Sequence, residues 1–280
     1  MSTLSAELQY KINEYDLYRK NEKIFAEKTG LQKKFAKDFP IKRIKQLKLD
    51  EYIVGKGSKD SFCYRIETGL IKLGNMKGAT STKFGIYYGK QGKDIEKKYR
   101  HTKKYGNSRK EAFENIKLSI CNLLIAGKAD NRDGIVKSKL APIYRYKLLG
   151  SYFPDIYLNL YSDEHIDYFL SELGINNATH TIYDKQKVLL QFKNDHKILS
   201  TWSNIEFNPF LYKALGRPPV KKEEKQKLDS LPPIEKVKPE IINFDIINLR
   251  TGNQPINKRS RKKYKPNYEE QNDRNNRLGQ

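Results

Sequence analysis

Apolar residues at helical spacing recur along the first 216 residues and predict a largely helical fold. The clearest signal is the capping box SRKE (108–111), followed at spacings of three and four by Phe113, Ile116, Ile120, Leu123 and Leu124. The segments DSFCYRIETGLIKLG (60–74) and DEHIDYFLSELGI (163–175) carry the same pattern, and TIYD (181–184) opens another helix. Each of these helices has one apolar face, so we expect them to pack around a core.

The stretch KFGIYYGKQGKDIEKKYRHTKKYG (83–106) departs from this pattern. Two runs that contain aromatic residues flank a glycine turn, which predicts an antiparallel pair of strands at 83–90 and 95–105. A further buried strand is expected within FPDIYLNLYS (153–162), after a proline break. The predicted fold class is therefore α+β, with a small antiparallel hairpin or sheet packed with several amphipathic helices.

Composition divides the chain into three parts. Residues 1–38 are predicted to form a helical N-terminal arm, and residues 39–216 an α+β domain. After Gly216 the chain is rich in proline and mixed charge, and KRSRKKYK (258–265) is strongly basic. Such a segment buries too little apolar surface to order itself, so residues 217–280 are predicted to be a flexible linker and a disordered basic tail.

Charge is the strongest indication of a partner. The chain has 55 Lys and Arg against 33 Asp and Glu, a formal net charge of +22, which exceeds what solubility requires. This balance favours nucleic acid over an anionic membrane surface or an acidic protein. A general lysine bias, of the kind found in proteins from AT-rich genomes, would raise the charge as well, so the placement of the basic residues is more informative than their number.

The N-terminal stretch MSTLSAELQYKINEYDLYRK lacks the basic run and apolar core of a signal peptide, and no run of about 18 apolar residues occurs. We therefore expect a cytoplasmic protein without a membrane anchor. Cys63 and Cys121 stand far apart, with no CxxC pair and no neighbouring histidine ligands, which indicates neither a zinc site nor a disulfide framework. No metal and no cofactor are predicted.

The predicted hairpin concentrates the basic residues. Ten Lys or Arg occur between positions 83 and 110, while Asp94 and Glu96 are the acids that precede Glu111. Strand alternation is expected to give the hairpin a positive face that can follow a phosphate backbone. Its tyrosines can stack on bases or pack across the strands. The residues predicted to bind DNA are Lys83, Lys90, Lys97, Lys98, Tyr99, Arg100, Lys103, Lys104 and Arg109.

Catalytic motifs are weak. GIYYGKQ (85–91) has three residues between its glycines, where a P-loop has four. Asp94, Glu96 and Lys98 form a D-x-E-x-K string similar to the strand of PD-(D/E)xK nucleases, in which two carboxylates hold a divalent ion and a lysine orients the water. Because these carboxylates lie in a basic turn, a solvated hairpin is the simpler interpretation. We predict no catalytic site and keep a divergent metal-dependent nuclease as the alternative.

The order of several motifs resembles the N-terminal region of bacterial restriction proteins related to McrB. The matching stretches run from FPIKRIKQLKLDEYIVGKG to FGIYYGK (39–90), then KKYGNSRKEAFENIK (103–117), then YKLLGSYFPDIYLNLYSDEHIDYFLSELGI (146–175). The resemblance covers about residues 39–215. In such proteins this region precedes an AAA+ GTPase or a nuclease-like domain and supplies DNA specificity.

The resemblance implies a DNA-binding recognition module of a restriction or phage-defence system, with double-stranded DNA as its partner. YKPNYEEQNDRNNRLGQ (264–280) resembles the connector that leads into the nuclease-like domain of relatives. The effector half is therefore expected to be absent, because the chain is a truncated product, an excerpt of a longer protein, or a subunit whose nuclease or AAA+ GTPase effector is separately encoded. Two alternatives stay open: a scaffold whose helices dock such an effector, and RNA in place of DNA.

Overall fold

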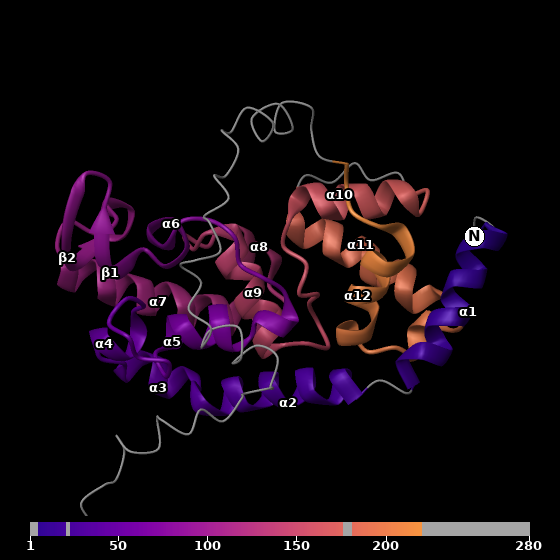
Figure 1. Ribbon diagram of the computed structural model, residues 1–280, viewed down its shortest axis with the longest axis horizontal. Helices are drawn as coiled ribbons and strands as arrows, with labels where there is room; N and C mark the ends of the chain where they lie inside the picture. Colours follow the sequence, from indigo (N-terminus) through magenta and orange to yellow (C-terminus); the bar gives the residue numbers. More distant parts are fainter. Residues whose placement is uncertain (1–4, 21–22, 176–180, 220–280) are drawn as a thin grey trace, which may run out of the picture. The chain divides into compact units, whose positions relative to one another are not determined.

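The computed structural model describes residues 5–20, 23–175 and 181–219, all of which belong to one compact unit, Met1–Pro219. Most of the predicted tail, residues 220–280, lies outside the described residues. In the described part, many helices accompany one two-stranded antiparallel sheet, so the chain has the predicted α+β fold (Figure 1). None of these helices is long and apolar enough to cross a membrane.

The described residues form helices, strands and short helical turns. In order they are α1 (Ala6–Lys20), α2 (Lys23–Asp38), α3 (Ile41–Gln46), α4 (Leu49–Tyr52), α5 (Phe62–Tyr64), the π-helical turn η1 (Arg65–Gly69), the 3₁₀ turn η2 (Ile71–Leu73), α6 (Thr80–Phe84), β1 (Ile86–Gln91), β2 (Asp94–His101), the 3₁₀ turn η3 (Lys103–Tyr105), α7 (Arg109–Lys128), α8 (Arg132–Val136), α9 (Pro142–Tyr152), α10 (Asp163–Glu172), α11 (Ile182–Asp195), the 3₁₀ turn η4 (Leu199–Thr201) and α12 (Asn204–Leu215).

Two clusters of buried side chains hold the unit together. The first forms around α7, which contacts α3, α8 and α9, and it includes the fully buried Phe62 and Tyr144. The second joins α1 to α10, α11 and α12 and includes Trp202. Helix α2 contributes Phe35 to the first cluster and Phe25 to the second. The helices of the predicted N-terminal arm are thus part of both cores, whose apolar burial is the main stabilising contribution.

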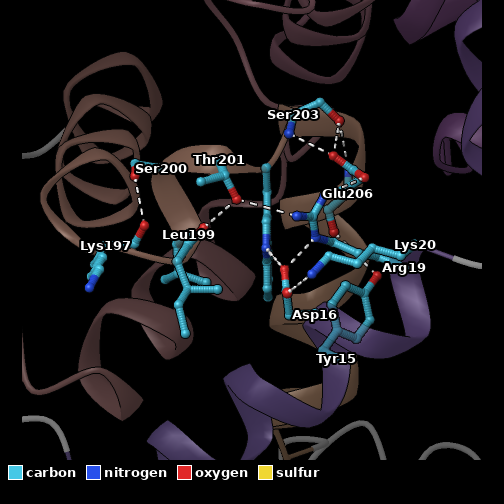
Figure 2. A network of polar contacts seen from close by, with 12 residues as sticks. Tyr15, Asp16, Arg19, Lys20, Lys197, Leu199, Ser200, Thr201, Ser203 and Glu206 are labelled. Carbon is cyan, nitrogen blue, oxygen red and sulfur yellow. Dashed lines mark hydrogen bonds and ion pairs between the residues drawn. The ribbon is translucent and has the colours of Figure 1, made fainter.

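A polar network fixes α1 against α12 (Figure 2). Asp16 accepts a 2.7 Å hydrogen bond from the Trp202 indole Nε1 and lies 2.8 Å from the Arg19 guanidinium, which reaches Glu206 at 2.9 Å. Burial raises the pKa of Asp16, but hydrogen bonds from Lys20, Trp202 and Arg19 outweigh it and lower that pKa to about 2. Glu206 also belongs to the capping box of α12, so helix docking and helix capping share one carboxylate.

The strongest helix signal in the sequence corresponds to α7, the longest helix in the described residues. Ser108 is its N-cap, as predicted, and the Ser108 Oγ accepts a 3.2 Å hydrogen bond from the Glu111 N–H. The Glu111 carboxylate accepts a bond from the N–H of Asn107 at 2.9 Å. Thr181 caps α11 in the same way, through the N–H of Asp184.

The strand expected within 153–162 does not form. Leu158 and Leu160 are buried there, but the chain is irregular. The Gln186 side chain of α11 accepts a 3.2 Å hydrogen bond from the Leu158 N–H, and its Nε2 donates to the carbonyls of Leu158 and Leu160. A buried glutamine therefore satisfies backbone groups that a neighbouring strand would otherwise bind.

Candidate nucleic-acid interface

The basic hairpin consists of β1 and β2, paired antiparallel, with Tyr88 opposite Tyr99 and an irregularity between Gly89 and Gln91. Within the unit it lies at the end opposite α1 (Figure 1). Both strands are shorter than expected. Strand β1 begins after α6, where Gly85 takes a left-handed turn with φ of 72°, and β2 ends where η3 begins.

An aromatic and polar anchor fixes the base of the hairpin. The rings of Tyr88 and Tyr99 meet edge to face, with centroids 5.3 Å apart. The Tyr99 hydroxyl donates to Asp50 at 2.7 Å and accepts from the Lys56 Nζ at 2.6 Å, and Lys56 also lies 3.0 Å from Asp50. The hydrogen bonds from Tyr99 and Lys56 lower the pKa of Asp50. Tyr99, predicted to bind DNA, thus also holds the hairpin to the preceding loop.

That loop, GKGSK (55–59), adds two exposed lysines, Lys56 and Lys59, beside the hairpin. It lies directly on β1, where the Tyr88 N–H donates to the Val54 carbonyl at 3.0 Å. Gly55 has φ of 103°, and a Cβ at this position would lie 1.8 Å from the Tyr88 carbonyl oxygen, so glycine is required for the approach. This loop is not among the residues predicted from the sequence, although its paired glycines between basic residues are a visible signal.

The acids of the hairpin are neutralised on one face of β2. Asp94 Oδ2 lies 2.8 Å from Arg100 and 3.0 Å from Lys98, and Lys98 also lies 3.0 Å from Glu96. Hydrogen bonds from Arg100 and Lys98 lower the pKa of Asp94 to about 2. Lys98 and Arg100 therefore share a face with both acids, and that face carries balanced charge instead of the expected positive charge.

Lys83 lies apart from this surface because it belongs to α6 and not to the strand. Its side chain is buried, forms an ion pair with Glu67 and donates to the Met76 carbonyl at 3.1 Å. A buried and paired lysine of this kind stabilises the turn before β1. It is not placed to contact a polyanion on the surface.

The remaining cations are available to solvent. Lys90 and Lys97 on the strands, Lys93 in the turn, and Lys103 and Lys104 in η3 are all exposed, and none of them forms an ion pair among the described residues. We refer to these five residues as the unpaired lysine set. Arg109, at the start of α7, lies over the Tyr99 ring at 4.8 Å and extends the basic surface towards the helix.

The alternative nuclease residues Asp94, Glu96 and Lys98 are brought together, but as a closed set of ion pairs. Lys98 lies 3.0 Å from a carboxylate oxygen of each acid. No group of three or more His, Cys, Asp or Glu suited to hold a metal ion occurs among the described residues. A divalent ion would have to displace Lys98 and Arg100 from the carboxylates before it could bind them.

The chain matches no protein-family model, no curated protein and no solved structure. The geometry of the hairpin and the order of the sequence motifs are therefore what support a functional proposal.

Proposed function

We propose that the hairpin and the adjoining GKGSK loop bind double-stranded DNA, and that the protein is the recognition module of a restriction or phage-defence system. The observation that carries this proposal is the separation of charge on the hairpin. Asp94 and Glu96 are neutralised by Lys98 and Arg100, whereas the unpaired lysine set is exposed and has no ion-pair partner in the described chain.

Physical chemistry favours a polyanion for such a surface. Unpaired lysines that contact phosphates release the counterions condensed on DNA, which supplies most of the sequence-independent binding free energy. A two-stranded ribbon also fits the width of the major groove. The contacts of Tyr99 with Asp50 and Lys56 hold the ribbon in place before binding, so less conformational entropy is lost when DNA docks.

The place of the module in a defence system is supported by the order of its motifs, which resembles that of McrB-related restriction proteins. Lysine contacts to phosphate position a protein on a duplex without reading its sequence. Sequence specificity would come from further contacts to base edges in the groove. The cleavage or translocation activity would be supplied by a nuclease or an AAA+ GTPase.

The test is binding of fluorescently labelled duplexes, methylated and unmethylated, measured by anisotropy. One variant replaces the unpaired lysine set by alanine. The matched control replaces five other exposed lysines that form no ion pair among the described residues, Lys33, Lys37, Lys128, Lys139 and Lys197. Both variants lose the same net charge. We expect the first to bind at least about tenfold more weakly and the control to retain most of the affinity.

Four results would separate the alternatives. Equal weakening in both variants would show that overall charge, and not the hairpin, attracts DNA. An absence of binding in the native protein at low salt would favour the partner-docking scaffold. Equal or tighter binding of RNA duplexes would move the proposal from DNA to RNA, whereas a preference for methylated duplexes would support the restriction system.

A further inference from the structure

A second basic site lies in a cavity of about 430 Å³ to which α9, α10 and α12 contribute. Tyr161, His165, Tyr212 and Arg217 line it, and Lys77 lies at the same cavity. A neighbouring cavity of about 260 Å³ also contacts Tyr212 and Arg217. The larger volume is in the range of pockets that bind small molecules, and the lining combines aromatic rings with a few polar groups, which is typical of such pockets.

The lining is positively charged. It includes the cations Lys77 and Arg217 and the imidazole of His165, and it includes no Asp or Glu. The His165 Nδ1 lies 2.9 Å from the Tyr212 hydroxyl, which fixes the orientation of the imidazole. Burial lowers the pKa of His165, Arg217 and Lys77 lower it further, and Glu164 opposes them. The cavity is therefore suited to an anion.

The wall of the cavity is rigidly built. Gly74 has φ of 122°, and a Cβ there would lie 2.7 Å from the Tyr161 hydroxyl, so glycine lets the ring close against the backbone. The Tyr161 hydroxyl donates to the Asn75 carbonyl at 3.0 Å. The fully buried Lys147 donates hydrogen bonds to the carbonyls of Leu70 and Gly74, at 2.8 Å each. These bonds fix the backbone of Gly74, which is part of the cavity lining.

Two residues in the lining, Asn159 and Asn208, have a buried carboxamide oxygen without a hydrogen-bond partner among the described residues. The carboxamide oxygen of Asn208 is buried and accepts no hydrogen bond among the described residues, while its Nδ2 donates to the Asn159 carbonyl at 3.3 Å. Buried acceptors are rarely left without a donor. Both oxygens are closed to solvent in this conformation, so a ligand N–H or O–H group would reach the Asn208 oxygen only after the side chain turns.

We propose that this cavity binds a small organic phosphate of mononucleotide size. The phosphate would lie between Lys77 and Arg217, because a guanidinium pairs with phosphate oxygens in a bidentate manner. A planar base would pack on the rings of Tyr161 and Tyr212. The proposal does not depend on the hairpin, which contributes no residue to the cavity.

The test is isothermal titration calorimetry of the full chain with AMP, GMP, CMP and UMP, with inorganic phosphate, and with the matching nucleosides. We expect at least one nucleotide to bind with a stoichiometry of one and about tenfold or more tighter than its nucleoside. Arg217→Ala and Lys77→Ala should each weaken that binding about tenfold or more. The control is Lys139→Ala, an exposed lysine in a different cavity, which should leave binding unchanged.

The same titrations can overturn the proposal. Millimolar nucleotide that produces no binding heat, or binding that persists in both Arg217→Ala and Lys77→Ala, would contradict it. A short single-stranded oligonucleotide that binds more tightly than every mononucleotide would assign the cavity to a nucleic-acid strand instead of a free nucleotide. The variant that lacks the unpaired lysine set should bind nucleotide normally, so failure of the DNA proposal and failure of this one are distinguishable.

Discussion

The Arg100 guanidinium lies 2.8 Å from Asp94 Oδ2 on one face of β2, and Lys98 lies 3.0 Å from the same oxygen. Two of the predicted DNA contacts thus already have an anionic partner. Lys97, next to Lys98 in the strand, is exposed and has no ion pair among the described residues. Cations held by acids must exchange partners before they can bind phosphate, so the hairpin contains two functionally different groups of basic residues.

Removal of the acids should therefore strengthen DNA binding. The double variant Asp94→Asn and Glu96→Gln releases Lys98 and Arg100 and adds two units of positive charge at the hairpin. We expect its affinity for duplex DNA at low salt to rise about threefold to tenfold. Anisotropy titrations measure this change, and a loss of affinity would mean that the acids contribute to binding.

The ion pairs of the same two carboxylates also bear on whether the protein is a metal-dependent nuclease. We expect the native protein to leave duplex DNA intact in the presence of magnesium, because Asp94 and Glu96 are occupied by cations. Cleavage is followed on a supercoiled plasmid. Magnesium-dependent cutting that disappears in Glu96→Ala, while DNA binding survives, would establish the metal-dependent nuclease and contradict our account.

Alanine substitutions at two glycines of the GKGSK loop test how the loop supports the hairpin. Gly55 and Gly57 both have positive φ, 103° and 86°, so alanine strains the backbone at either position. A Cβ at Gly55 would also collide with the Tyr88 carbonyl, whereas a Cβ at Gly57 has nothing within 4 Å. We expect Gly57→Ala to cost about 1 kcal/mol and Gly55→Ala clearly more. Urea denaturation gives both values, and only Gly55→Ala should also weaken DNA binding.

The Asp16 network makes the stability of the unit depend on acidity. The folded pKa of Asp16, about 2, lies below the ordinary value of about 3.9 for a free aspartate. Its contribution is present above about pH 4 and is lost as the pH falls towards 2. We expect Asp16→Asn to lower the free energy of unfolding by about 2 kcal/mol at pH 6 and by much less at pH 2.

The control for that measurement is Asp133→Asn on α8. Asp133 is exposed and pairs with Lys137 across one helical turn, so its replacement should change stability little at either pH. If Asp16→Asn behaved like Asp133→Asn, the docking of α1 would not depend on the network in Figure 2.

The buried Lys147 should give a second pH dependence of stability, in a higher pH range. Burial lowers the pKa of Lys147 to about 7, whereas a lysine in the unfolded chain stays protonated up to about pH 10. The unfolded state therefore binds more protons between these limits, and the folded state gains stability as the pH rises through them. We expect the native protein to become more stable relative to Lys147→Met between about pH 7 and 10, measured by denaturant unfolding. A difference in stability between the native protein and Lys147→Met that does not vary with pH would contradict the lowered pKa of Lys147.

Local signals in the sequence were sufficient for part of the fold. The Ser108 cap and the helical spacing of Phe113 and Ile116 located α7, because capping and burial of one face act within a few residues. The hairpin was located for the same reason, since its turn glycine and flanking aromatic residues are local features. Its charged face, with Lys98 and Arg100 together, followed from the two-residue repeat of a strand.

Contacts between distant residues were beyond the reach of such signals. The pairing of Gln186 with the backbone of Leu158 depends on how α11 packs, and no local pattern encodes it. The sequence pattern placed Lys83 in the first strand, among the DNA-binding residues. Its ion pair with Glu67 forms only when α6 folds against η1, so no local pattern predicts it. The basic cavity could not be predicted from the sequence for the same reason, because only the tertiary structure brings Lys77 and Arg217 to one cavity.

Two adjacent residues of β2 show whether the unpaired lysines of the hairpin contact DNA phosphates. Lys97→Ala and Lys98→Ala each remove one positive charge, but only Lys98 is held by Asp94 and Glu96. The measurement is the slope of log affinity against log salt for a short duplex. We expect Lys97→Ala to flatten the slope by about 0.9 and Lys98→Ala to leave it nearly unchanged. Equal slopes in the two variants, or a flatter slope in Lys98→Ala alone, would contradict it.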